Sequence, residues 1–246
     1  MSKFAVLVMA AGKSTRFGDP HYKKPFASLD GRAVWLHAVE RFMNRDDVCQ
    51  TIVVIAPEDR EEFQRKFGAN LAFMDIDLCE GGAERSDSVR AGLAKVSDQA
   101  THVAVHDAAR PCVRDKEIDA VFAAAVEHRA ATLATPVAAT LKRVDEQSQI
   151  VETVPREALW AAQTPQVFER SLIERAHESA GDEPVTDDAQ LVERLGEKVA
   201  VVEGSPQNLK ITTQDDLKLA EMILGARPRP KPDKAAHPFE DDDLWR

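Results

Sequence analysis

The sequence predicts an α/β fold built around a mainly parallel sheet. Short, apolar and largely β-branched runs recur along the chain, which is typical of strands buried in a parallel sheet. Stretches with apolar residues at helical spacing lie between these runs. Strands that alternate with helices favour parallel pairing through right-handed crossovers.

Strands are expected at five apolar runs: Phe4–Met9, residues 51–56, 103–105, 131–134 and 199–202. Helices are expected where apolar residues share one face. One such face comprises Ile118, Val121, Phe122, Ala125 and Val126, and a second comprises Val89, Leu93 and Val96, with Ser86 as the N-cap. Further helices are predicted at residues 171–179, 187–195 and 214–224, the last beginning with a capping box between Thr213 and Asp216.

Two segments depart from this alternation. Residues 137–154 contain two β-like runs around a polar turn, which predicts a hairpin inserted into the domain. A hairpin is marginally stable by itself, so it must pack on something, such as a second subunit. Residues 1–225 are therefore predicted to form one domain, and the proline-rich, acidic residues 226–246 a flexible tail.

Composition excludes several classes of function. The chain of 246 residues holds 42 acidic and 32 basic side chains, a net charge of -10, which argues against nucleic-acid binding through a general basic surface. The three cysteines form no CxxC pair, which fits a reducing compartment. The first apolar run is too short for a signal sequence or a membrane span. We therefore expect a cytoplasmic protein without a nucleic-acid or membrane partner.

The loop after the first strand is the most informative segment. Gly12-Lys13-Ser14 suggests a Walker A loop, but Leu7 stands where that motif needs its first glycine. The dinucleotide-binding fingerprint fails as well, because its second glycine would fall on Ser14. Small residues and a local cluster of cations remain: Lys13, Arg16, Lys23 and Lys24. This pattern predicts either a phosphate-binding loop or a solvated basic loop.

A second segment, His106 to Pro111, follows another strand. An Asp at the carboxyl end of a sheet strand lies where ligands bind in open α/β folds, so Asp107 is a candidate ligand of Mg²⁺. Arg110 could clamp a phosphate. The alternative is an Asp–Arg pair that only holds a turn, and the lone His106 is interpreted as structural.

The remaining candidates are weaker in isolation. Gly81 and Gly82, before a helix, allow close backbone contact with a flat ligand such as a base, but in isolation a loop with capping residues explains them better. Each of several other polar residues has an ordinary structural explanation as a cap, a turn or a solvated charge: Thr140, Lys142, Arg143, Arg156, Thr164, Thr186 and Lys210.

Taken together and in this order, these segments resemble the 2-C-methyl-D-erythritol 4-phosphate cytidylyltransferase family. The motifs are AAGKSTRFG with KKPF, GGAERSDSVRAGL, VHDAARP, PVAATLKR, AAQTPQVF, PVTDDA and NLKIT. The resemblance covers about residues 4 to 224. It implies a Rossmann-like nucleotidyltransferase domain with a protruding β-arm at residues 137–154, which pairs with the arm of a second subunit in a homodimer.

The resemblance also implies roles for individual residues. Ala10, Ala11 and Gly12 would line the CTP site, with Gly81, Gly82 and Ser88 holding the cytosine and ribose. Arg16, Lys24 and Lys210 would be catalytic cations, and Asp107 would bind Mg²⁺. The acceptor phosphate would contact Arg110, Thr164 and Thr186, together with Thr140 and Arg156 from the neighbouring subunit.

The implied reaction transfers the CMP moiety of CTP to 2-C-methyl-D-erythritol 4-phosphate in the non-mevalonate isoprenoid pathway. Its products are 4-diphosphocytidyl-2-C-methyl-D-erythritol and pyrophosphate. Ribitol-5-phosphate cytidylyltransferase is an alternative that shares the nucleotide motifs. A catalytically silent nucleotide-binding protein, and a binding module that acts through the acidic tail, also fit parts of the sequence.

Overall fold

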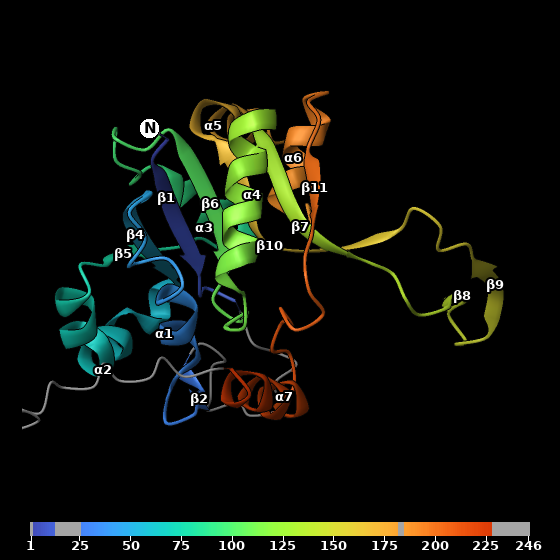
Figure 1. Cartoon of the computed structure of the whole chain (residues 1–246), viewed down its shortest axis with the longest axis horizontal. Helices are drawn as coiled ribbons and strands as arrows, with labels where there is room; N and C mark the ends of the chain where they lie inside the picture. Colours follow the sequence, from blue (N-terminus) through green and yellow to red (C-terminus); the bar gives the residue numbers. More distant parts are fainter. Residues whose placement is uncertain (1, 13–25, 182–184, 228–246) are drawn as a thin grey trace, which may run out of the picture.

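The computed structural model describes residues 2–12, 26–181 and 185–227. Within them, a seven-stranded sheet has the order β11-β7-β10-β6-β1-β4-β5 (Figure 1). Its strands are β1 (Phe4–Met9), β4 (Val48–Ile55), β5 (Asp77–Glu80), β6 (His102–Asp107), β7 (Ala130–Pro136), β10 (Trp160–Glu169) and β11 (Ala200–Glu203). The five predicted strands are all present, and the α/β class is confirmed.

The sheet is parallel except at one strand. β1 pairs in parallel with β4 and β6, β4 with β5, and β7 with β11. β10 runs antiparallel to both of its neighbours, β6 and β7. The chain passes from β7 to β10 through a hairpin and not through a helix, and such a direct return gives antiparallel pairing.

Helices cover both faces of the sheet. They are α1 (Val34–Val39), α2 (Arg60–Phe73), α3 (Arg85–Leu93), α4 (Asp115–His128), α5 (Arg170–Glu178), α6 (Asp188–Arg194) and α7 (Gln214–Gly225), with a short 3₁₀ helix at Pro57–Asp59. One apolar core joins the sheet to α1, α2 and α4, and a second joins it to α3, α5 and α6. In Figure 1, α4 crosses the near face of the sheet.

A smaller apolar cluster lies at the carboxyl end of the sheet. α7 packs there through Ala220 against Leu29 of β2 (Ser28–Leu29), which pairs with β3 (Arg32–Ala33). The capping box predicted for this helix is confirmed, since Thr213 and Asp216 exchange side-chain and backbone hydrogen bonds. The cap predicted for α3 is wrong, because Glu84 and not Ser86 is its N-cap.

Besides the short strands β2 and β3 and the 3₁₀ helix, four elements were not predicted, and each has a weak local pattern. β5 is an edge strand that buries Cys79 among polar neighbours. α2 buries only Phe63 and Leu71, and α1 is a short helix. β10 contains Pro165, which argues against an interior strand on sequence alone. The register of β10 against β7 shifts between Ala162 and Gln166, and this irregularity accommodates the proline.

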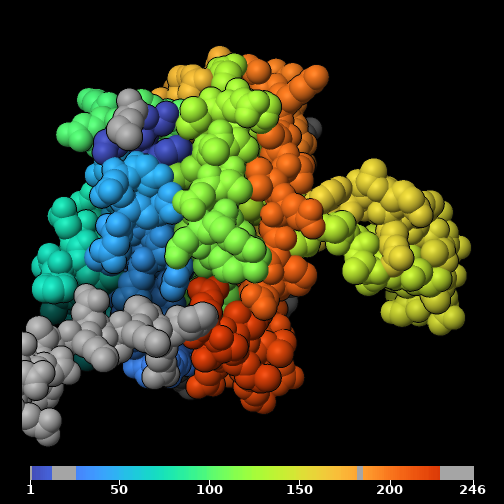
Figure 2. Space-filling view, in the orientation of Figure 1, coloured from blue at the N-terminus to red at the C-terminus, as the bar shows by residue number. Residues whose placement is uncertain are grey.

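A hairpin occupies the segment predicted for the arm. β8 (Leu141–Val144) and β9 (Ile150–Val154) pair antiparallel, and the hairpin extends away from the body of the molecule (Figures 1 and 2). Val144 and Ile150 are cross-strand partners and are 52% and 65% exposed. The hairpin therefore buries little apolar surface within this chain. Of the predicted tail, residues 226–246, only Ala226 and Arg227 are described, and Ala226 is the C-cap of α7.

Candidate active site

The candidate residues gather where β1 and β6 end. Met9 and Asp107 are register partners at the carboxyl ends of these parallel strands. The Ala10 amide then donates to the Val54 carbonyl at 2.7 Å, and the Ala108 amide donates to the Met9 carbonyl at 3.0 Å. The first loop and the Asp107 turn therefore leave the sheet side by side, as the sequence predicts.

Asp107 lies at the centre of a group of cations. Lys210 Nζ is 2.9 Å and Arg110 Nε 3.4 Å from its Oδ2 atom. Burial alone would raise the pKa of this carboxyl group, but Lys210, Arg85 and Arg110 outweigh burial and lower the pKa to about 2. Asp107 is therefore ionised throughout the neutral pH range and available as an oxygen ligand.

Arg110 holds two parts of the site together. Besides Asp107, its Nη1 donates to the carbonyl of Asn208 at 2.7 Å, across 98 positions of the sequence. Only 12% of its side chain is exposed. The turn interpretation and the phosphate interpretation of this pair are thus compatible. The same guanidinium fixes the turn and leaves Nη2 without a partner among the described residues.

Hydrogen bonds from His106 and Thr164 fix the turn that follows Asp107. The Thr164 hydroxyl accepts a hydrogen bond from the Asp107 amide at 3.0 Å and lies 3.2 Å from His106 Nδ1. Burial lowers the pKa of His106 to about 4, so its ring is neutral at pH 7. Thr164 then donates to Nδ1, and Nε2 donates to the Arg110 carbonyl at 3.1 Å. The sequence analysis expects Thr164 to contact the acceptor. Its hydroxyl is already hydrogen-bonded to the Asp107 amide and to His106 Nδ1.

The glycine segment packs directly against the first loop. A Cβ on Gly81 would lie 2.5 Å from Ser88 Oγ and 3.3 Å from the Cβ of Ala11, and one on Gly82 would lie 2.4 Å from the Cβ of Asp87. Ser88 is 2% exposed, and its hydroxyl accepts from the Gly82 amide at 3.1 Å. Two of the predicted nucleotide-binding segments are therefore adjacent, and glycine is required for this contact.

The loop that carries Lys210 is anchored from both sides. Asn208 is fully buried and donates to the Thr164 carbonyl at 2.9 Å and to Gln163 Oε1 at 3.2 Å. The Ile211 amide donates to the Ala109 carbonyl at 2.8 Å. These bonds hold the Lys210 ammonium group beside Asp107 even though 44% of the side chain is exposed.

Other predicted residues lie elsewhere. Thr186 is exposed ahead of α6, where its amide donates to Gln190 Oε1 at 3.0 Å. Thr140 and Arg156 flank the two strands of the hairpin and are exposed, with Arg156 donating to the Ala138 carbonyl. The hairpin extends away from the sheet that ends in Asp107 (Figure 1). Arg16 and Lys24, with Lys13 and Lys23, lie outside the described residues.

Two residues at the site were missed by the sequence reasoning. Arg85, which follows the glycine pair, forms an ion pair with Asp188 and lowers the pKa of Asp107. Its position as a cation beside a predicted base-binding segment was a usable signal. Asn208 begins the quoted motif NLKIT, but its role depends on contacts with residues more than 40 positions away, which the sequence does not show.

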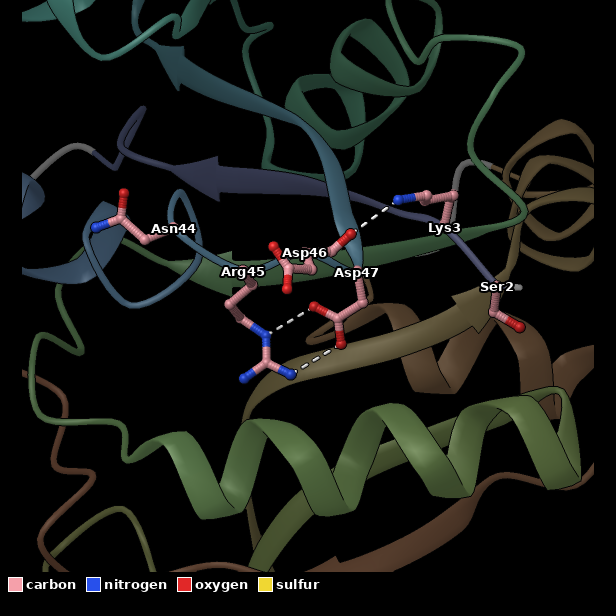
Figure 3. Close-up of a pocket in the computed structure, with 6 residues that line it drawn as sticks. All are labelled: Ser2, Lys3, Asn44, Arg45, Asp46 and Asp47. Atoms are coloured by element: carbon pink, nitrogen blue, oxygen red, sulfur yellow. Dashed lines mark hydrogen bonds and ion pairs between the residues drawn. The ribbon is translucent and has the colours of Figure 1, made fainter.

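A separate cavity of about 570 Å³ lies at the other end of the sheet (Figure 3). It is lined by Ser2, Lys3, Asn44, Arg45, Asp46 and Asp47. Arg45 donates twice to the Asp47 carboxylate, and Lys3 donates to the backbone carbonyl of Asp46.

The described residues include no group of three or more His, Cys, Asp or Glu side chains that could hold a metal ion. Over the same residues, no helix combines the length and the apolar character needed to cross a membrane.

Comparison with known proteins shows which family the chain belongs to. The sequence profile of 2-C-methyl-D-erythritol 4-phosphate cytidylyltransferase matches residues 4–226. The enzyme of that name from Rhodopirellula baltica is 44% identical over 231 residues, which cover 89% of this chain and 94% of that protein. The one from Halalkalibacterium halodurans is 41% identical over 230 residues, 92% of this chain and 99% of that protein.

Solved structures agree as well. The Thermus thermophilus enzyme of the same name superposes with a TM-score of 0.74 at 33% identity, covering 89% of this chain and 98% of that one. The 4-diphosphocytidyl-2C-methyl-D-erythritol synthase of Anaerococcus prevotii gives a TM-score of 0.77 at 28% identity, with 91% and 99% covered. The chain therefore belongs to the 2-C-methyl-D-erythritol 4-phosphate cytidylyltransferase family.

Proposed function

We propose that this chain transfers the CMP moiety of CTP to 2-C-methyl-D-erythritol 4-phosphate, releasing pyrophosphate, as a step of non-mevalonate isoprenoid synthesis. The proposal is supported by its family and by the names of its relatives. The structural observation that carries it is the ionised Asp107 between Lys210 and Arg110. This cluster lies at the sheet edge from which the two nucleotide-binding segments emerge.

The site fits Mg²⁺. Asp107 supplies an ionised, hard oxygen donor at a strand end, and both of its cationic partners bind the same atom, Oδ2. One or two carboxylates, completed by phosphate oxygens and water, suffice for Mg²⁺ in proteins. When bound, the ion would neutralise phosphate charge. Asp107 is the residue that would hold it.

The reaction needs electrostatic stabilisation more than proton transfer. A phosphate oxygen of the acceptor attacks the α-phosphorus of CTP, and the bond to pyrophosphate breaks. The attacking phosphate monoester is largely a dianion at pH 7, because its second pKa is about 6, so no general base is required. The chain must bring two polyanions together, and Lys210 and Arg110, with Arg16 and Lys24, would offset their repulsion.

Selection of cytosine would depend on backbone groups of the glycine segment. Gly81 and Gly82 allow the chain to approach a flat base closely, and Ser88 holds the Gly82 amide in place. A backbone carbonyl can accept a hydrogen bond from the amino group of cytosine. Uracil presents a carbonyl at that position and would leave the acceptor unpaired, which disfavours UTP.

Pyrophosphate release tests this function. CTP and Mg²⁺ are supplied with either 2-C-methyl-D-erythritol 4-phosphate or ribitol 5-phosphate, and Asp107→Asn is the matched, nearly isosteric control. Turnover with the first acceptor, reduced at least about 10²-fold in the variant, supports the proposal. Preference for ribitol 5-phosphate would identify the protein as the ribitol-phosphate enzyme. Absence of turnover with both, despite CTP binding, would indicate a silent nucleotide-binding protein.

We also propose that the enzyme is a homodimer joined through the hairpin arm. Val144 and Ile150 form an exposed apolar pair there, which a second arm would cover. Thr140 and Arg156 flank the strands of the same arm and would reach the acceptor of the neighbouring subunit.

Cys49, Cys79 and Cys112 are free thiols, which fits a cytoplasmic enzyme.

A further inference from the structure

The guanidinium of Arg85 joins the starts of two helices, α3 and α6, which follow the glycine segment and Thr186 respectively. Arg85 is the first residue of α3, directly after the glycine segment, and Asp188 is the first residue of α6, two positions after Thr186. Arg85 Nη1 lies 2.7 Å from Asp188 Oδ2. We infer that Arg85 is a positioning residue of the transfer reaction, which holds the nucleotide segment and the Thr186 segment at one fixed spacing.

The Asp188 end of this bridge is rigid. Asp188 is 1% exposed, and its other carboxylate oxygen lies 3.1 Å from His177 Nε2 of α5. Gln166 of β10 accepts from the amides of Asp188 and Ala189, each at 3.1 Å. The start of α6 is therefore attached to α5 and to the central sheet, so Arg85 pairs with a fixed point and not with a mobile side chain.

The Arg85 end is equally well defined. α3 packs in the same apolar core as α5 and α6, and its first turn is closed by the capping box of Glu84 and Asp87. The Ser88 hydroxyl, further along α3, accepts a hydrogen bond from the Gly82 amide. A displacement of Arg85 would consequently move the glycine segment as well.

Arg85 also faces the reaction centre electrostatically. Burial by itself would lower the pKa of Arg85, but Asp188 and Asp107 outweigh burial and raise it. In turn, Arg85 contributes to the lowered pKa of Asp107. The bridge therefore joins the start of α3 to the start of α6, and Arg85 lies within electrostatic range of the proposed metal ligand.

The test rests on the proposed function and separates positioning from folding and from direct binding. Arg85→Lys keeps the charge but loses the forked geometry of the guanidinium. Arg114→Lys is the matched control, because Arg114 is 31% exposed and pairs with Glu117, 3% exposed, at 2.6 Å. The Arg85 pair is alike: the Arg85 side chain is 30% exposed, Asp188 is 1% exposed, and the two groups are 2.7 Å apart. Arg114 and Glu117, however, lie within one helical turn.

For Arg85→Lys we expect kcat to fall about 100-fold, since a misplacement of about 1 Å can cost that much. The Kd for CTP, measured by calorimetry, and the KM for the acceptor should each stay within about 3-fold of wild type. Asp188→Asn should give the same pattern, and the double variant should be no worse than either single variant. Arg114→Lys should retain the wild-type kcat.

Several outcomes would overturn the inference. An unchanged kcat with only a lower Tm would make Arg85 a structural residue. A weakened affinity for CTP or acceptor at unchanged kcat would make it a binding residue, and additive single effects would show that it acts without Asp188. Wild-type protein without turnover would instead refute the proposed function, and this inference with it, so the two failures are distinguishable.

Discussion

Single side chains at this site carry more than one duty. Asp107 is the proposed metal ligand and is also the anion that holds Lys210 and Arg110 in place. Arg110 is at once a candidate phosphate ligand and a bridge to Asn208. His106, interpreted as structural from sequence, proves to be the group that orients the Thr164 hydroxyl. Substitutions here should therefore affect both charge and geometry.

Lys210 offers the cleanest test of charge. Lys210→Met nearly retains the length of the side chain but removes the ammonium group beside Asp107. We expect kcat/KM to fall about 10²–10³-fold, by analogy with the loss of one stabilising donor. Lys218→Met, on the exposed surface of α7, is the control and should leave kcat/KM unchanged. A loss of less than about 10-fold for Lys210→Met would exclude a catalytic role.

His106 predicts how stability depends on pH. Its pKa is about 4 in the folded protein against 6.5 for the free side chain, so between these values the unfolded chain binds more protons. Stability conferred by the neutral ring is therefore lost as pH falls, by about 2 kcal/mol between pH 8 and pH 5. Urea denaturation of the metal-free protein at several pH values measures it. His106→Phe should lose correspondingly less, and parallel curves for the two proteins would contradict the prediction.

At the scale of elements, one of the two helix caps predicted from the sequence is present in the structure. The box of Thr213 and Asp216 was predicted from spacing alone and is present in α7. α7 begins three residues after Ile211, whose amide is bonded to Ala109. The cap therefore stabilises an element that is continuous with the loop that carries Lys210.

Thr213→Ala should lower the free energy of unfolding by about 1 kcal/mol, because the Asp216 amide loses its acceptor. For a chain of this size the corresponding drop in Tm is about 2–4 °C. Thr213→Ser retains the hydroxyl and is the control. If the alanine and serine variants melt together in calorimetry, the cap contributes nothing to stability.

At the scale of the whole molecule, the hairpin arm is the feature whose apolar residues the described part of this chain leaves exposed. Its apolar pair, Val144 and Ile150, lies in solvent, whereas the two cores of the body bury their apolar residues on both faces of the sheet. Such an exposed pair on a projecting hairpin favours association with a complementary surface.

Ile150→Lys should convert the proposed dimer into a monomer, because it places a charge where the second arm would pack. Turnover should fall with it, since Thr140 and Arg156 would no longer reach a neighbouring site. Sedimentation velocity measures the mass, and Glu146→Lys, a charge change at the hairpin turn, should remain dimeric. A monomeric wild-type protein, or a variant that stays dimeric, would refute the proposed interface.

Sequence alone determined the fold class, the positions of the ligand-bearing segments at strand ends, and the hairpin. These depend on periodicity and on spacing along the chain, which are local properties. Tertiary structure decided that β10 enters antiparallel and brings Thr164 beneath Asp107. It also decided that Lys210 reaches Asp107 and that Arg85 meets Asp188. Such contacts join residues that are far apart in the chain, so only the packing of helices and strands around the two cores can select them.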